Sequence, residues 1–336
     1  MKIIRLSDTV GKKSENLQLT KFIASIMVIL SHSFVLTMAP NDKEWFVGLT
    51  DRQLSMGSFA VAIFFLCSGY LISMSLEKSK TAIRFFKVRL LRLVPPLFFV
   101  CLAVTLLCGF ISDLSLSEYY SHPETWGYLR NAVFIKQLNL PGVFVHNLYG
   151  PTVNGSLWTL RLEFICYILC FILYKLKFYH KKRFLITIPI VFFASCFLWN
   201  QIAIIPNIRE ILRPALLFYI GIFFWIYREH IRLHFVGLII SFLVLILLFH
   251  YGYGYLAMFF CFPYICMVLW FGLPQCSSKL GILGNYSYAI YLWAFPIQQS
   301  IIHFHGGQMN SYINFFISSI ITIIVSIPTY HFIEKR

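Results

Sequence analysis

Long apolar runs separated by short polar segments make up most of the sequence. The runs are helical in length and lack the short apolar and polar alternation of barrel strands. Because lipid offers no partner to backbone N–H and C=O groups, such runs must be helices. We therefore predict an all-α, polytopic integral membrane protein with ten transmembrane helices, at Phe22–Met38, Ser58–Ser75, Leu93–Ile111, Leu157–Tyr174, Phe184–Ile205, Leu212–Tyr227, Phe235–His250, Tyr255–Leu273, Ile282–Ile302 and Tyr312–Ile333.

The basic residues fall in alternate connecting segments. With ten spans, the segments on the side of the N-terminus hold 21 of the 28 Lys and Arg residues. Three clusters account for most of them, at Lys12 to Lys21, Lys78 to Arg92 and Lys175 to Arg183. Cytoplasmic loops of membrane proteins carry such an excess. The bias predicts that both termini lie in the cytoplasm.

Composition agrees with a membrane protein. Hydrophobic residues make up 59% of the chain and charged residues 12%, far more apolar surface than one soluble core of this length needs. The net charge of +15 would suggest nucleic acid in a soluble protein, but topology explains it without such a partner. The nine cysteines form no Cys-x-x-Cys pair and lie mostly in apolar runs, so we expect no metal site.

One outer segment is long, from about Ser112 to Ser156. Loops of this length usually fold back as a lid or a substrate surface, and a disordered connector is the alternative. No internal repeat and no matched pair of broken helices is visible, which weakens a transporter interpretation. We expect residues 1–336 to form a single membrane domain.

Two titratable residues lie inside predicted spans. His32 is well inside the first span, and Glu163 is less than two turns into the fourth. The predicted topology puts both in the outer half of the membrane. A histidine can take the proton from a hydroxyl that attacks a thioester, and a carboxylate can orient the imidazole. The alternatives are a His bonded to the helix backbone and a Glu paired with Arg161 or another inward-facing cation.

Two arginines mark the cytoplasmic start of the third span. Arg89 and Arg92 are three residues apart, so a helix presents them on one face. Guanidinium groups can bind phosphate oxygens in a bidentate fork, and coenzyme A is a cytoplasmic polyanion that fits such a site. Positive-inside topology with contacts to membrane lipid headgroups is the alternative.

Small and polar groups inside spans are weaker signals. Asn154 to Trp158 (Asn-Gly-Ser-Leu-Trp) precedes Glu163, and Ser68-Gly69-Tyr70 lies within the second span. Small residues in spans more often serve close helix packing than chemistry. The Gly-x-Ser-x-Gly, His-Glu-x-x-His and phosphate-loop motifs are absent from the sequence, which argues against a hydrolase, zincin or ATPase of soluble type.

In chain order, these segments resemble the membrane-bound acyltransferase 3 family, whose bacterial members O-acetylate lipopolysaccharide O-antigen, capsule and related glycans. The resemblance extends over nearly the whole chain. It rests on Lys21 followed by His32 after ten positions, Phe-Phe-Leu-Cys-Ser-Gly-Tyr at Phe64 to Tyr70, Arg89-x-x-Arg92 before Pro95, Asn154 to Glu163, Leu283 to Trp293, and the terminal Phe-Ile-Glu.

The resemblance implies ten spans in the bacterial inner membrane, acetyl coenzyme A bound from the cytoplasm, and a polysaccharide or lipid-linked oligosaccharide acceptor reached from the periplasm. Carried over by position, it makes His32 catalytic and Glu163 its acidic partner or an acceptor-site residue. It implies no metal. It assigns donor binding to Arg89, Arg92, Lys21, Ser68 and Tyr70, and acceptor binding to Asn154, Trp158, Tyr291 and Trp293.

Three departures from the family pattern limit the transfer of roles. Lys21 replaces the commoner Arg, Arg161 stands where Ser or Pro is more frequent, and Ala294 occupies a position that is His in many relatives. We expect no fused periplasmic esterase-like domain.

Two functions are compatible with the pattern. The first is a membrane O-acyltransferase that moves acetyl from acetyl coenzyme A to a sugar hydroxyl of a surface polysaccharide. The second is a flippase or transporter of a lipid-linked glycan, which needs cations along the headgroup path. Charge inside the spans is scarce beyond Arg161 and Glu163, which favours the enzyme. The sequence leaves open which hydroxyl is modified, whether the donor carries acetyl or another short acyl group, and whether an acyl-enzyme forms.

Overall fold

The computed structural model describes residues 3–39, 43–79, 81–199, 201 and 207–335. The described chain is mostly helical, and its strands are the two-residue pair β1 (Ile4–Arg5) and β2 (Arg232–Leu233). It divides into two compact units. Unit 1 comprises residues 1–20, 61–85 and 162–281, and unit 2 comprises residues 21–60, 86–161 and 282–336. Four helices, α1 (Glu15–Leu36), α3 (Met56–Lys78), α4 (Ala82–Cys108) and α7 (Trp158–Lys175), continue from one unit into the other.

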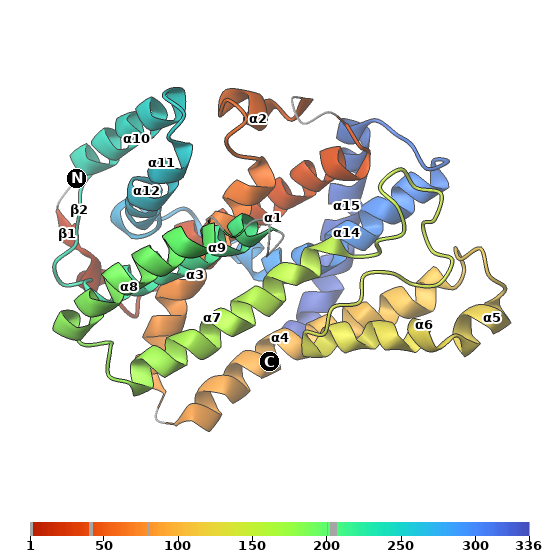
Figure 1. The fold of residues 1–336 in the computed structure, drawn as a ribbon, viewed down its shortest axis with the longest axis horizontal. Helices are drawn as coiled ribbons and strands as arrows, with labels where there is room; N and C mark the ends of the chain where they lie inside the picture. Colours follow the sequence, from red (N-terminus) through yellow and green to blue (C-terminus); the bar gives the residue numbers. More distant parts are fainter. Residues whose placement is uncertain (1–2, 40–42, 80, 200, 202–206, 336) are drawn as a thin grey trace. The chain divides into compact units, whose positions relative to one another are not determined.

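Unit 2 is built around two neighbouring helices, α14 (Ser287–Phe304) and α15 (Ser311–Thr329) (Figure 1). They pack with the later part of α1 through apolar side chains that include Ile29, Ile290 and Ala294. The unit also contains most of α4 and the short helices α2 (Trp45–Leu49), α5 (Leu116–Ser121), α6 (Pro123–Gly127), η3 (Tyr128–Val133), η4 (Gly155–Leu157), η6 (Ile282–Tyr286) and the π-helix η7 (Tyr330–Glu334).

Unit 1 holds most of α3 and α7 together with α8 (Lys181–Trp199) and α9 (Ile208–Ile226). Helices α3 and α9 are in backbone contact at Gly69. A Cβ at this position would lie only 2.0 Å from the Phe218 carbonyl oxygen, so no larger residue fits there. This contact accounts for Gly69 in the Ser-Gly-Tyr segment. The unit is completed by β1, η1 (Leu6–Thr9), β2, α10 (Phe235–His250), α11 (Gly254–Phe260), α12 (Phe262–Met267), the π-helix η5 (Val268–Gly272) and α13 (Ser278–Gly281).

Within the described residues, six helices are long and apolar enough to cross a membrane, and a seventh span results if one bent pair counts as one. The protein is therefore a multi-pass, all-α chain, as predicted. The other predicted spans are helical but shorter or more polar, since α10 has 16 residues, α9 begins with Arg209, Glu210 and Arg213, and α14 contains Gln298 and Gln299. The six are Glu15–Leu36, Met56–Lys78, Ala82–Cys108, Gly155–Lys175, Lys181–Trp199 and Ser311–Glu334.

Several predicted boundaries need correction. The first and third spans begin earlier than the apolar runs, because the polar residues before them continue the same helices, so Lys21, Arg89 and Arg92 are helical. The predicted span Tyr255–Leu273 is bent by 43° between α11 and α12. Pro263 explains the break, since proline has no N–H and its ring clashes with the preceding turn. The predicted end of the fifth span, at residues 202–205, lies outside the described residues.

The segment of residues 112–156, which was predicted to be a long outer loop, is folded. It contains short helices within unit 2, and two of its tyrosines, Tyr119 and Tyr128, are buried. Gln299 of α14 fixes the later part of the segment by donating to the carbonyl oxygens of Gly150 (3.1 Å) and Thr152 (2.9 Å). The segment is thus a structured surface and not a disordered connector.

Candidate functional site

His32 lies on α1 in unit 2, between two serines that fix the rotation of the helix. The Ser31 hydroxyl donates to Glu44 Oε2 at 3.1 Å, and the Ser33 hydroxyl donates to Asn314 Oδ1 at 3.0 Å. The imidazole contacts Phe295 edge-on, with ring centroids 5.3 Å apart. Its Nδ1 is buried and has no hydrogen-bond partner among the described residues. The ring is therefore positioned by packing, with a nitrogen that the described part of the protein does not use.

Glu44 is a buried carboxylate that sequence reasoning did not identify. Besides accepting from Ser31, its Oε1 accepts the backbone N–H of Met56, the first residue of α3. Burial raises the pKa of Glu44 above its ordinary value, and the bonds from Met56 and Ser31 only partly offset that effect. Glu44 thus ties the start of α3 to the residue that precedes His32. The sequence carried no distinct signal for it, because Glu44 follows the polar residues Asn41, Asp42 and Lys43 and looks like part of a solvated loop.

A second polar network lies behind Ser33. The amide of Gln298 on α14 donates to the Ile29 carbonyl oxygen (2.8 Å) and to the Ser33 hydroxyl (2.7 Å). Asn314 on α15 joins the same group through its side-chain oxygen. These side chains are fully buried, so the network holds α1, α14 and α15 in one register.

Glu163 lies on α7 in unit 1, within a cluster of hydroxyl groups. Its Oε1 accepts hydrogen bonds from the Ser68 hydroxyl (2.8 Å) and from the Tyr167 hydroxyl one turn further along α7. The structure shows these hydroxyl partners for Glu163, whereas the predicted alternative partner, Arg161, has an exposed side chain. Ser68, expected at the donor site, contacts this carboxylate, and its role in donor binding stays a prediction. His32 and Glu163 belong to different units, and their pairing stays a prediction.

The cationic residues expected to bind the donor gather in unit 2 at the start of α4 and within α1. Lys21 and Arg92 both interact electrostatically with Glu334, the last residue of η7. Arg89 is one turn before Arg92 on the same helix. Lys21 and Arg92 are therefore close to the same carboxylate in unit 2. Sequence reasoning noted the terminal Phe-Ile-Glu but gave Glu334 no place in the site.

Tyr70 packs inside unit 1. Its ring meets Trp225 and Phe271 at centroid distances of 5.5 and 5.4 Å, and its side chain is hydrogen-bonded to Thr9. These contacts hold the Tyr70 side chain in the interior of unit 1, and its role in donor binding stays a prediction.

The four residues expected to bind the acceptor lie in unit 2. Asn154 is buried, donates to the Leu292 carbonyl oxygen (3.0 Å) and accepts from the Ser156 N–H (3.1 Å). Tyr291 donates to the Ser156 carbonyl oxygen (2.8 Å), and Trp293 donates to the Thr329 hydroxyl (3.0 Å). Trp158 is the most exposed of the four, at 36%. These contacts fasten the start of α7 to α14, and acceptor binding by the four residues stays a prediction.

The described residues contain no group of three or more His, Cys, Asp and Glu side chains placed to hold a metal ion. The polar groups described above are His32, the Glu163 hydroxyl cluster and the cations near Glu334. A polar network buried among membrane helices, next to a positioned imidazole, is typical of an enzyme that works within the bilayer.

Sequence comparison defines the class of that enzyme. The pattern of the acyltransferase 3 family, described as "Acyltransferase domain", matches residues 14–331. The chain belongs to this family. It is an acyltransferase that acts on hydroxyl groups, and the transporter alternative is set aside.

The chain is similar to an O-acetyl transferase of Shigella phage Sf6, with 29% identity over 339 positions that cover 96% of each chain. It is also similar to O-acetyltransferase OatA of Staphylococcus aureus, with 26% identity over 85% of this chain and 53% of that protein. Nodulation protein 10 of Rhizobium leguminosarum bv. viciae is 25% identical over 63% of this chain and 57% of its own length. No solved structure matches the chain.

Proposed function

We propose that this membrane acyltransferase transfers acetyl from cytoplasmic acetyl coenzyme A to a sugar hydroxyl of a surface polysaccharide, either O-antigen, capsule or an exopolysaccharide unit. The observation that carries the proposal is His32, a histidine within the first span whose Nδ1 is buried and has no partner among the described residues. The names of the Sf6 and OatA relatives support acetyl as the group and O-acetylation as the reaction.

In the proposed reaction the acceptor hydroxyl attacks the thioester carbonyl carbon while the imidazole of His32 takes its proton. The carbon–sulfur bond then breaks, and the coenzyme A thiolate receives a proton from the imidazolium. The products are the acetyl ester and free coenzyme A. Ser31 and Ser33 keep the imidazole in place through their bonds to Glu44 and Asn314.

Donor binding is proposed at Lys21, Arg89 and Arg92. Phosphate groups of coenzyme A suit guanidinium forks, and the shared interaction of Lys21 and Arg92 with Glu334 supports the proximity of these two cations in unit 2. The three positions are at or before the apolar part of their helices, where a soluble, charged donor meets the membrane.

The proposed topology has ten spans in the bacterial inner membrane with both termini in the cytoplasm. It follows from the distribution of Lys and Arg and places the folded segment of residues 112–156 on the periplasmic side, where the glycan arrives. The buried bonds of Asn154 and Tyr291 support a rigid base for that surface.

The proposal is tested with the purified chain, acetyl coenzyme A and isolated O-antigen or capsule oligosaccharides. We expect coenzyme A release that depends on the acceptor and a mass increase of one acetyl group on the glycan. Release of coenzyme A without glycan acetylation across a panel of surface polysaccharides would remove the polysaccharide acceptor, and lack of any release would remove acetyl coenzyme A as donor.

A further inference from the structure

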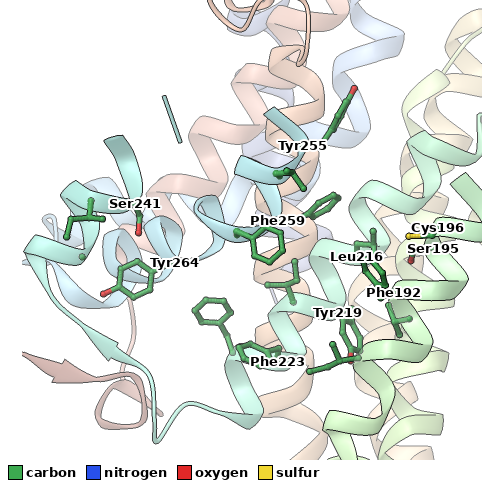
Figure 2. Close-up of a pocket in the computed structure, with 18 of the residues that line it drawn as sticks. Phe192, Ser195, Cys196, Leu216, Tyr219, Phe223, Ser241, Tyr255, Phe259 and Tyr264 are labelled. Atoms are coloured by element: carbon green, nitrogen blue, oxygen red, sulfur yellow. The ribbon is translucent and has the colours of Figure 1, made fainter. Parts of the chain in front are cut away.

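Unit 1 contains a large apolar cavity that the acyl-transfer chemistry does not use. Its volume is about 990 Å³, at the upper end of the range for small-molecule sites. It lies among α8, α9, α10, α11 and α12, and Figure 2 shows the rings of Phe192, Tyr219 and Phe259 on its walls. Apolar cavities of this kind hold hydrocarbon and not water.

Two of the helices around this cavity, α8 and α10, have little protein cover. Helix α10 has no buried residue, and α8 exposes Phe193 and Phe197 on the side away from the cavity. In a membrane protein, such faces contact lipid. Hydrocarbon from the bilayer therefore reaches the cavity without crossing polar surface.

A polar pocket of about 370 Å³ adjoins the cavity. It is lined by Arg5, Ser7, Glu229, His230 and Arg232. Arg232 lines both the apolar cavity and the polar pocket. Tyr264, which lines the apolar cavity, donates to the Arg232 carbonyl oxygen at 2.9 Å and so fixes this residue at the boundary. The combined shape suits an amphipathic ligand.

The polar pocket has an excess of positive charge. In the antiparallel pair of β1 and β2, Arg5 stands directly opposite Arg232. Like charges in directly opposed positions destabilise a strand pair. Glu229 does not balance them, because it forms an ion pair with Lys181 at 2.5 Å. No ion pair is recorded for Arg5 or Arg232 within the described ranges.

We propose that unit 1 binds one anionic phospholipid of the cytoplasmic leaflet, with its acyl chains in the apolar cavity and its phosphate between Arg5 and Arg232. The bound phosphate relieves the repulsion of the two opposed guanidinium groups. The chains complete the packing that α8 and α10 lack.

The leaflet follows from the proposed topology, in which residues 1–21 and 228–234 both face the cytoplasm. The inner leaflet is the one that carries anionic lipid against basic juxtamembrane segments. The site is independent of acetyl transfer, so the two proposals stand or fall separately.

The test uses the full chain purified in mild detergent and exchanged into nanodiscs of phosphatidylcholine with or without phosphatidylglycerol. Native mass spectrometry then counts the lipid that stays bound. The headgroup variant is Arg5→Gln with Arg232→Gln, and Lys182→Gln with Arg183→Gln is its control, because it removes two exposed cations of the same side outside the pocket. The chain variant is Ser195→Trp, which fills the cavity, and Phe193→Trp on the exposed side of α8 is its control.

We expect one phosphatidylglycerol per chain in the wild type and in both controls. Retention should fall by about fivefold or more in the headgroup variant and in the chain variant, and added phosphatidylglycerol should raise the melting temperature of the wild type but not of the headgroup variant. Equal retention of phosphatidylcholine, displacement by palmitoyl coenzyme A but not by phosphatidylglycerol, or unchanged retention in the headgroup variant would overturn the proposal. Size-exclusion profiles identify a variant that fails to fold, and the remaining variant then decides.

Discussion

The Glu163 carboxylate accepts hydrogen bonds from two hydroxyl groups, and these bonds define the expected effect of replacing it. Its carboxylate accepts from Ser68 and Tyr167, so both hydroxyl protons point toward one oxygen. Glu163→Gln keeps the shape but weakens both bonds, because charge-assisted hydrogen bonds are about twice as strong as neutral ones. We expect kcat for acetyl transfer to fall by about ten- to a hundredfold with little change in the KM for acetyl coenzyme A.

Variants that each remove one of the two hydroxyl groups bonded to Glu163 are the controls for Glu163→Gln. Ser68→Ala and Tyr167→Phe should each lower kcat less than Glu163→Gln, because either variant leaves one hydroxyl bonded to the carboxylate. If Ser68→Ala raised the KM for acetyl coenzyme A and left kcat unchanged, Ser68 would belong to the donor site, as the family resemblance implied.

The raised pKa of Glu44 should make the stability of the folded protein depend on pH. Burial raises its pKa in the folded protein above the unfolded value, so its contribution to stability is fully present below the ordinary carboxyl pKa and is lost as pH rises through the folded value. Glu44→Gln mimics the neutral acid. The melting temperature of Glu44→Gln relative to wild type should therefore increase from about pH 5 to about pH 8.

Glu118 is the matched control for Glu44. The hydroxyl and backbone N–H of Ser115 hold the pKa of this exposed carboxyl below its ordinary value. Its contribution to stability is therefore constant across the same pH range, and Glu118→Gln should shift the melting temperature by a constant amount. A pH-independent difference for Glu44→Gln would contradict the account of its burial.

At the scale of elements, the long helix α4 presents Arg89 and Arg92 on one side. Arg89→Gln and Arg92→Gln should raise the KM for acetyl coenzyme A by about tenfold each and spare kcat, because a phosphate contact is made equally in the ground and transition states. Lysine at either position should restore the KM only in part, since it lacks the guanidinium fork. Lys87→Gln, an exposed cation on the same helix, should leave the KM unchanged. Normal donor KM together with a raised acceptor KM in the arginine variants would rule out the cytoplasmic-donor site.

The accuracy of the predicted helix bounds depended on the residues that flank each helix. Phe235–His250 was predicted to the residue, because an uninterrupted apolar run has the same bounds as its helix. The start of α4 was not, because nothing local separates a helical basic segment from a loop. The bend before Pro263 was missed, although a proline signals a helix break, because the apolar run continues on both sides of it and was taken as one span.

Some residues of the candidate site were identified from the sequence, and others were not. His32 and Glu163 were visible because polar groups in apolar runs are costly. Their partners were not, since Ser33, Gln298 and Asn314 come from distant parts of the chain and meet only in the folded unit. Glu44 and Glu334 were missed because their burial depends on packing that no local pattern encodes.

At the scale of the whole molecule, topology decides which compartment each substrate comes from. Reporter fusions in the Lys175 to Arg183 segment and at the C-terminus should give a cytoplasmic signal, and fusions in the folded segment of residues 112–156 a periplasmic one, because the Lys and Arg bias sets the orientation. A periplasmic signal from a fusion at Lys181 would reverse the topology and the assignment of the donor to the cytoplasm.

The central claim is that His32 is the base for acetyl transfer. The most direct measurement is the rate of glycan acetylation by His32→Ala and His32→Gln in membranes, normalised to the amount of inserted protein. Because a general base contributes about a hundred- to ten-thousandfold in rate and little to the fold, both variants should insert normally and lose activity by at least about a hundredfold. Phe295→Leu, which only loosens the ring contact, should retain most of the rate. Wild-type activity in either His32 variant would contradict the account.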